Sequence, residues 1–287
     1  MPEKVNTASS QGPVEMSLLG ETKFLLRKYR IFPKRRLSQH FTVDPSIFQL
    51  MAEYADLNDD DVVLDIGAGF GFLTRFLAGK CRKVLAVERD SKVAIALRDL
   101  LRDLPNVVVV EGDVLKVQLP TFNKVVAIPP YSISSNLIQW LFGKPIICAV
   151  LVLQKEFANK LVAPIGSNDY SWLTVLAYYH FDIELLDEVP RQAFYPQPEV
   201  DSVIVLFKPK HPRPFHVKNE EKFKRFVQVM FTQRNKKVKN AVQAFIKKEH
   251  ATAERSMQHG GSIPFQDRRV RELAPEDFGV LANVFTS

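Results

Sequence analysis

A glycine-rich loop is the first group of residues in this chain whose spacing could do chemistry. The loop reads Asp65-Ile-Gly67-Ala-Gly69-Phe-Gly71, and its glycines permit a tight turn and the close approach of a ligand to the backbone. In a dinucleotide-binding fingerprint the third glycine follows the second by three residues, whereas Gly69 and Gly71 are two residues apart. The spacing disfavours a nicotinamide dinucleotide and favours the cofactor loop of a methyltransferase.

Two acidic residues come at the ends of the next apolar runs. Glu88 ends the run 83–87, where an acceptor-only side chain can take two hydrogen bonds from ribose hydroxyls. Asp113 follows four consecutive valines and can accept from an adenine amino group, while Val114 can cover the ring. Read singly, Glu88 could be an exposed strand-terminal acid and Asp113 a helix N-cap. Together with the glycine loop, they predict a site for a cofactor that contains adenosine.

A third group combines two prolines with an aromatic ring. The run Val126-Ala-Ile-Pro-Pro-Tyr131-Ser-Ile-Ser-Ser135 closes another apolar stretch. A tyrosine in this position can stack on a base, although a tyrosine after two prolines is equally often part of the core.

These groups must be held by alternating strands and helices. Apolar runs predict strands at 62–66, 83–87, 107–110, 124–128 and 147–153, and helical periodicity predicts helices at 45–55, 72–80 and 91–103. The alternation predicts an α/β fold with a Rossmann-like, mostly parallel sheet covered by helices on both faces. The runs 181–187 and 200–208 have no long helix between them and predict an antiparallel pair at one sheet edge.

Composition along the chain predicts three parts. Residues 1–16 are small and polar without periodicity, which predicts a flexible leader. Residues 17–210 form the predicted cofactor-binding catalytic domain. After the proline-rich run 208–214 the periodicity is helical, which predicts a small basic helical domain over 211–287.

Charge favours a polyanionic partner. The net charge is +7, and the basic residues gather at 27–36 and 208–248.

Neither a membrane span nor a secretory signal is evident, so we expect a cytoplasmic protein that does not enter membranes. Cys81 and Cys148 are expected to be buried reduced thiols, and the histidines lack ligand-like spacing, so no metal site is expected.

At residues 128–134 the chain resembles the small-subunit ribosomal RNA adenine dimethyltransferases. Their signature Asn-Leu-Pro-Tyr-x-Ile-Ser is matched by Ile128-Pro-Pro-Tyr131-Ser-Ile-Ser134. The resemblance runs from about Leu37 to the C-terminal end and includes Ser38-Gln-His-Phe41, Gln154-Lys-Glu156, Gly166-Ser-Asn-Asp-Tyr170, the stretch Phe194-Tyr-Pro-Gln-Pro-Glu-Val-Asp-Ser202 and Phe231-Thr-Gln-Arg234. The C-terminal stretch Arg271-Glu-Leu-Ala-Pro-Glu-Asp-Phe278 resembles archaeal members.

The resemblance implies a class I methyltransferase fold and an activity. Methyl groups would pass from S-adenosylmethionine to N6 of two adjacent adenosines near the 3′ end of small-subunit ribosomal RNA, on a pre-small ribosomal subunit, by a monomer. The implied catalytic residues are Ile128, Pro129, Pro130, Tyr131 and Phe194. The implied cofactor-binding residues are Gln39, His40, Phe41, Gly67, Gly69, Gly71, Glu88, Arg89, Asp113, Val114 and Ile128.

Ile128 departs from the family pattern. It stands where the family has Asn, and its aliphatic side chain accepts no hydrogen bond, which leaves the main-chain carbonyls of Ile128 and Pro129. Loss of one such hydrogen bond to the reacting amine should cost about 2 to 4 kcal/mol, so slowed methylation is expected. An introduced substitution, a natural variant that uses the backbone alone and a chain kept for binding without catalysis are the three explanations.

Basic residues near the start of the catalytic domain and in the helical domain are candidates for RNA contact, through salt-sensitive and weakly sequence-specific binding to phosphates. The candidates are Arg35, Arg36, Lys222, Arg225, Arg234, Lys236 and Lys237. Two other functions stay open: a large-subunit ribosomal RNA adenine methyltransferase, and a ribosome-assembly or RNA-binding factor that is catalytically weak or inactive.

Overall fold

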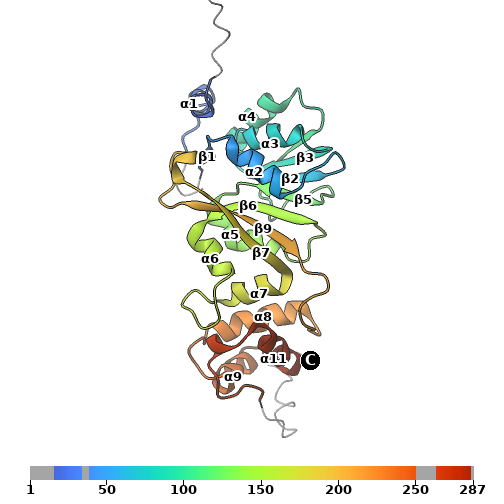
Figure 1. The fold of residues 1–287 in the computed structure, drawn as a ribbon, viewed down its shortest axis with the longest axis vertical. Helices are drawn as coiled ribbons and strands as arrows, with labels where there is room; N and C mark the ends of the chain where they lie inside the picture. The colour runs from blue at the N-terminus through green and yellow to red at the C-terminus, as the bar shows by residue number, and fades with distance from the viewer. Residues whose placement is uncertain (1–15, 34–38, 250–262, 286–287) are drawn as a thin grey trace, which may run out of the picture.

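A seven-stranded sheet forms the centre of the computed structural model, which describes residues 16–33, 39–249 and 263–285 (Figure 1). Its strand order is β4-β3-β2-β5-β6-β9-β7. The strands are β2 (Val62–Ile66), β3 (Lys83–Glu88), β4 (Val107–Glu111), β5 (Lys124–Ala127), β6 (Cys148–Gln154), β7 (Phe181–Val189) and β9 (Ser202–Pro209). The first five strands in the order are parallel, whereas β9 runs antiparallel to β6 and β7. The predicted Rossmann-like sheet with an antiparallel pair at its edge is confirmed.

Helices cover both faces of the sheet because successive strand residues point to opposite sides. Val63, Val84 and Val126 face one cluster, which includes residues of α2 (Ser46–Tyr54), α3 (Phe72–Ala78) and α4 (Ser91–Leu101). Leu64 and Leu85 face the other cluster, with residues of α5 (Ser134–Leu141), α6 (Lys155–Leu161) and α7 (Trp172–His180). Because β4, β3, β2, β5 and β6 run parallel, the loops that leave their carboxyl ends lie at one edge of the sheet.

Several helices differ from the predicted ones or were not predicted. α3 and α4 each end two residues before their predicted ends, at Ala78 and Leu101. No prediction covered α1 (Leu18–Lys28), α5, α6 or α7. In α7 all but Trp172 and Tyr178 are buried, so the helix shows no alternation of polar and apolar residues that periodicity could detect.

A second, two-stranded sheet lies apart from the main one. It pairs β1 (Phe41–Thr42) with β8 (Phe194–Tyr195) in antiparallel register, with Phe41 opposite Tyr195 and Thr42 opposite Phe194. The pairing brings the segment after residue 39 onto the loop between β7 and β9.

The C-terminal helices pack together and against α7. Residues of α8 (Glu220–Phe231), α9 (Val238–Glu249) and α11 (Pro275–Phe285) share one apolar cluster with Leu176 and Tyr179 of α7. Leu173 and Ala177 of the same helix belong to the cluster on the sheet. We retain a division after residue 210 as a proposal, with α7 packed against both parts; the leader proposed at 1–16 lies almost wholly outside the described residues.

Both cysteines are buried and neither forms a disulfide. Within the ranges that the structure describes, no helix has the length and apolar character needed to cross a bilayer.

Candidate functional site

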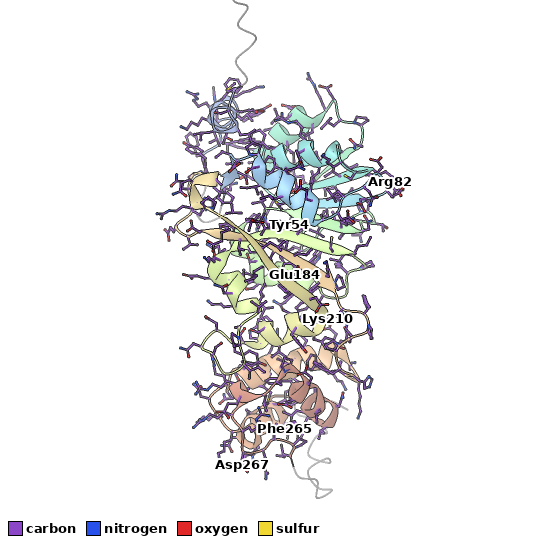
Figure 2. The ribbon with its side chains drawn as sticks, in the orientation of Figure 1. Tyr54, Arg82, Glu184, Lys210, Phe265 and Asp267 are labelled. Carbon is purple, nitrogen blue, oxygen red and sulfur yellow. The ribbon has the colours of Figure 1, made fainter. Side chains whose placement is uncertain are left out.

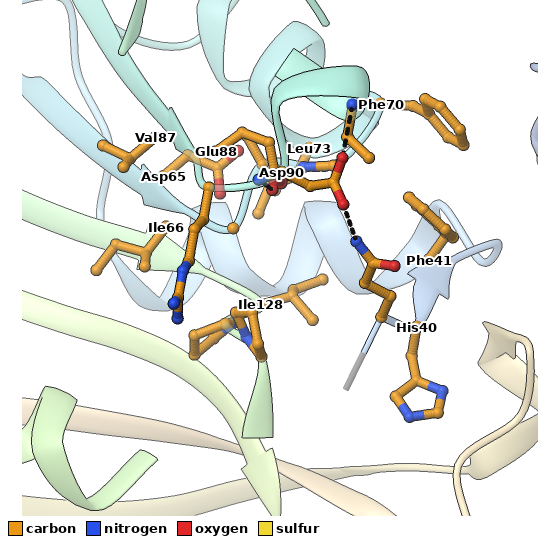
Figure 3. A pocket seen from close by; sticks show the side chains of 18 of the residues that line it. His40, Phe41, Asp65, Ile66, Phe70, Leu73, Val87, Glu88, Asp90 and Ile128 are labelled. Carbon is orange, nitrogen blue, oxygen red and sulfur yellow. Dashed lines mark hydrogen bonds between the residues drawn. The ribbon is translucent and has the colours of Figure 1, made fainter. Parts of the chain in front are cut away.

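A cavity of about 480 Å³ lies at the carboxyl ends of β2, β3, β4 and β5. It brings together almost all the predicted catalytic and cofactor-binding residues (Figure 3). Those that line it are Gln39, His40, Phe41, Gly67, Gly69, Glu88, Arg89, Asp113, Val114, Ile128, Pro129, Pro130, Tyr131 and Phe194. The carboxyl edge of a parallel sheet is where α/β proteins bind ligands, so topology and sequence agree on the site.

The glycine loop connects β2 to α3 through left-handed backbone. Gly67 has φ +74°, and a β-carbon there would lie 2.6 Å from Cδ of Pro130, so only glycine lets this loop approach the loop after β5. Gly71 requires a correction. It begins α3 with φ +80°, and a β-carbon would lie 2.6 Å from Cδ1 of Leu97 in α4. The lack of a side chain at Gly71 allows the start of α3 to pack against α4, and Gly71 does not line the cavity.

Glu88 ends β3 inside the cavity, with 9% of its surface exposed. The amide of Gly69 donates to Oε2 at 3.0 Å, and the amide of Asp90 donates to Oε1 at 2.8 Å. Burial raises the pKa of the carboxyl, against the lowering effect of these hydrogen bonds. Because an ionised carboxylate offers about four acceptor positions, each oxygen can still accept from a ligand hydroxyl.

Asp65 and Asp90 are cavity residues that sequence reasoning missed. Asp65 is 1% exposed and accepts from Oγ1 of Thr74 at 2.6 Å; burial raises its pKa to about 7. Both lie beside predicted residues, since Asp65 begins the glycine loop and Asp90 follows Glu88 by two positions. Proximity to those residues was the signal that could have identified them.

The cavity carries more negative than positive groups. Four carboxyl groups line it, from Asp65, Glu88, Asp90 and Asp113, against the two cations of Arg89 and Lys92. Because the pKa of Asp65 is about 7, this group is only partly ionised at neutral pH, and the other three carboxyl groups already outnumber the cations. Arg89 lies 3.9 Å from Asp113, and its side chain is 66% exposed. The balance suits a ligand that carries positive charge.

The motif after β5 forms the other side of the cavity. The hydroxyls of Tyr131 and Ser202 lie 2.6 Å apart, and burial raises the pKa of Tyr131 to about 12, so this phenol stays protonated. The His40 ring stacks against Tyr131 with centroids 5.9 Å apart. Nδ1 of His40 lies 2.7 Å from the carbonyl oxygen of Pro196, which can only accept, so Nδ1 carries a proton. These contacts hold the Tyr131 ring at a fixed angle.

Ile128 and Phe194 bring apolar surface to the same cavity. Ile128 is half-buried and packs against the cluster beneath α2 and α3. Phe194 is 2% exposed and enters the cavity wall from β8. Figure 3 shows Asp65, Glu88 and Asp90 on one side of the cavity, with Ile128 and His40 across from them.

The segment before β1 closes one side of the cavity. Nε2 of Gln39 donates to Oδ2 of Asp90 at 3.4 Å, while Phe41 stacks on Phe70 with centroids 4.5 Å apart. This side of the cavity is thus made by Gln39 and by Phe41, the latter paired with Tyr195 of β8, far along the chain.

The predicted RNA-binding residues lie elsewhere. Lys222 and Arg225 are exposed on α8, and Lys236 and Lys237 are exposed ahead of α9, at the end of the molecule opposite α1 (Figure 1). Lys237 also pairs with Asp267 at 3.3 Å. Arg35 and Arg36 fall outside the described residues.

Arg234 has a different environment from the other predicted RNA-binding residues. Its NH1 and NH2 groups donate to the carbonyls of Asn168 and Ser167, each at 2.9 Å. This geometry favours a structural role, in which Arg234 ties the C-terminal helices to the loop before α7, over the predicted RNA contact.

Comparison with known proteins identifies relatives that match most of the chain. The model of the family described as ribosomal RNA adenine dimethylase matches residues 33–278. A protein of Methanosarcina acetivorans named probable ribosomal RNA small subunit methyltransferase A is 38% identical over 260 residues, which cover 91% of this chain and 96% of the relative. A protein of the same name from Methanopyrus kandleri is 42% identical over 220 residues, covering 76% and 79%.

Two crystal structures resemble most of the fold. A dimethyladenosine transferase from Plasmodium falciparum matches with a TM-score of 0.71 and 28% identity, over 83% of this chain and 94% of that one. The 23S rRNA methyltransferase ErmE matches with a TM-score of 0.62 and 30% identity, over 86% and 100%.

Proposed function

Because the chain belongs to the ribosomal RNA adenine dimethylase family, we propose that it methylates N6 of two adjacent adenosines near the 3′ end of small-subunit ribosomal RNA, during assembly of that subunit. It is an S-adenosylmethionine-dependent enzyme of the archaeal type. The observation that carries the proposal is the single cavity that joins Glu88 and Asp113 to Tyr131 and Phe194. Archaeal relatives at 38% and 42% identity bear a small-subunit name, which favours that subunit over the large one.

The residues of the cavity fit S-adenosylmethionine. Glu88 has acceptor capacity left for ribose hydroxyls. Asp113 and Val114 line the same cavity, and the proposal assigns to them the adenine amino group and the adenine ring. The excess of carboxylates complements a ligand that bears a sulfonium and an ammonium group. When bound, this cofactor supplies an electrophilic methyl group.

The reaction needs a flipped adenine held with its amine in line with that methyl group. Tyr131 provides one stacking face and Phe194 the opposite one. The carbonyls of Ile128 and Pro129 accept from the amino hydrogens, which favours a more tetrahedral nitrogen. A methylated ammonium loses its proton readily, so no general base is required and His40 acts as part of the cavity wall.

Ile128 supports a second candidate function. Because its side chain provides no acceptor, the site holds the amine with main-chain carbonyls alone, and transfer is expected to be slow. A ribosome-assembly factor that binds the subunit and transfers little is therefore the alternative.

The protein is proposed to act in the cytoplasm, as a monomer, on a pre-small ribosomal subunit. The exposed cations Lys222, Arg225, Lys236 and Lys237 would neutralise phosphates.

The test is transfer of radiolabelled methyl groups from S-adenosylmethionine to purified ribosomal subunits that lack the modification. We expect label in small subunits, recovered as N6-methylated adenosine after digestion, and none in large subunits. Label in large subunits alone would assign the chain to the large-subunit class. Tight subunit binding without transfer, in this chain and in its Ile128→Asn variant, would favour the assembly factor.

A further inference from the structure

Helix α1 presents a cationic and aromatic surface that the proposed function does not use. Residues 16–33 contain four cations, all exposed, and a single carboxylate, Glu21, which pairs with Arg75 of α3 at 3.6 Å. Phe24 is 48% exposed and Phe32 is 81% exposed. We call this surface the α1 face and define it by Lys23, Phe24, Arg27, Lys28, Arg30 and Phe32.

Packing on the opposite side of α1 holds the α1 face toward solvent. Thr22, Leu25 and Leu26 are buried on the opposite side of the helix. The hydroxyl of Tyr29 donates to Asp99 of α4 at 3.0 Å. Since residues four apart share a helical face, Phe24 lies beside Lys28, and Lys23 beside Arg27. Among the described residues, Lys23, Arg27 and Lys28 form no ion pair, so their charge is available to a ligand.

The α1 face adjoins the cavity. Nζ of Lys23 lies 5.3 Å from the centroid of the Tyr195 ring. Tyr195 pairs with Phe41 in the two-stranded sheet and follows Phe194, and both phenylalanines line the cavity. Figure 1 places α1 next to β1, at the end of the molecule away from the C-terminal helices. The family model matches residues 33–278, so α1, which ends at Lys28, lies outside the matched region.

Arg30 adds a fourth cation to this surface, at a backbone position that favours glycine. Its φ is +52°, and the amide of Ile31 donates to the carbonyl of Leu26 at 2.9 Å, which closes the end of α1. Glycine is the usual residue at such a left-handed position after a helix. A residue with a β-carbon costs about 1 kcal/mol there. Position 30 thus carries a cation where glycine would be more stable, which allows the charge to be removed without loss of stability.

We propose that the α1 face binds single-stranded ribosomal RNA that flanks the target adenosines. Phe24 and Phe32 stack on bases, while Lys23, Arg27, Lys28 and Arg30 neutralise phosphates. Aromatic rings between cations are the usual means of binding unpaired nucleic acid. An RNA strand that leaves the cavity past Tyr195 meets this surface. The inference rests on the proposed function, because it assumes that the cavity receives an RNA base.

Binding of the full chain to RNA tests the proposal without requiring transfer. The probes are a fluorescein-labelled 12-nucleotide oligoadenylate and small subunits that lack the modification, each titrated at several KCl concentrations. The variants are Arg30→Gly, Lys28→Gln, Phe24→Leu and Phe24→Trp. The control is Arg82→Gln, which removes an exposed cation from the turn before β3, across the sheet from α1 (Figure 2).

Arg30→Gly separates binding from stability. It should unfold at the same temperature as the wild type or a higher one, yet bind oligoadenylate about 3- to 10-fold more weakly, with a salt slope lower by about 1. Lys28→Gln should weaken binding similarly. Phe24→Leu should lose about 5-fold or more in affinity, while Phe24→Trp retains it, because stacking needs an aromatic ring. Arg82→Gln should bind as the wild type does.

Equal affinities and salt slopes for the wild type, the α1 variants and Arg82→Gln would overturn the inference, whether or not methyl transfer occurs. Weakened binding by the α1 variants would uphold the α1 face even if neither subunit accepted methyl groups, in which case only the proposed function would fail. Vesicles of phosphatidylglycerol and phosphatidylcholine distinguish a membrane surface. If the variants reduced vesicle binding and left RNA binding unchanged, the inference would be wrong.

Discussion

The hydroxyl of Tyr131 lies 2.6 Å from the hydroxyl of Ser202, which is fully buried at the start of β9. Tyr131 follows the strand that carries the reaction motif, whereas Ser202 belongs to the antiparallel edge of the sheet. The bond therefore couples the angle of a base-stacking ring to the packing of the sheet. Ser202 is a positioning residue under the proposed function.

Ser202→Ala should lower the rate of methyl transfer about fivefold, because a neutral hydrogen bond contributes about 1 kcal/mol. Tyr131→Phe should lose a similar amount, and the double variant should lose no more than either single variant. Single-turnover transfer to small subunits measures these rates. Additive losses in the double variant would show that the two hydroxyls act separately.

Ile128→Asn should raise the rate of transfer about a hundredfold or more, because it restores a side-chain acceptor for the reacting amine. Ile128→Leu is the matched control and should bring no gain. Because Ile128 lines the cofactor cavity, calorimetry should measure the cofactor affinity of both variants, and the rates should be compared at saturating cofactor. Equal rates for the wild type and Ile128→Asn would mean that main-chain carbonyls suffice.

Glu88→Gln should weaken S-adenosylmethionine binding about 10- to 100-fold, because the amide has one acceptor oxygen and places donors beside the amides of Gly69 and Asp90. Glu111→Gln is a close control, since Glu111 is opposite Glu88 in register but exposed and paired with Arg98. Calorimetry should show a large loss for the first variant and almost none for the second. Similar losses would remove Glu88 from the cofactor site.

Asp65→Asn should stabilise the fold increasingly as the pH rises. Burial raises the pKa of Asp65 to about 7 in the folded chain, against about 3.9 when unfolded, so deprotonation costs stability between these two values. The difference in free energy of unfolding between variant and wild type should grow from pH 4 and become constant above about 7. Urea unfolding between pH 5 and 9 measures it. A difference that shrinks with rising pH would contradict this assignment.

Sequence patterns identified the strands of the parallel sheet and the cavity residues Glu88, Asp113 and Tyr131, because each depends on a short local run, whereas Gln39, His40, Phe41 and Phe194 came from the family resemblance. Glu88, Asp113 and Tyr131 each end such a run, and parallel strands bring their carboxyl ends to one edge. α7 escaped prediction because burial on nearly all sides removes the periodicity of an amphipathic helix.

Contacts between distant residues could not be predicted from local patterns. β1 and β8 are two residues long and pair across about 150 positions, so neither strand has a signal of its own. Ser202 and Arg234 matter through partners far away in the chain, Tyr131 and the carbonyls of Ser167 and Asn168. Charge alone suggested an RNA contact for Arg234, because a sequence does not show which cations form hydrogen bonds within the folded chain.

The double packing of α7 has a practical consequence. Leu173 and Ala177 pack against the sheet, while Leu176 and Tyr179 pack against the C-terminal helices, so one helix belongs to two cores. A fragment ending at residue 210 would uncover an apolar helix surface and self-associate. Cofactor binding and subunit binding must therefore be dissected by point substitution within the intact chain, and heating should melt both ends of the molecule in one step.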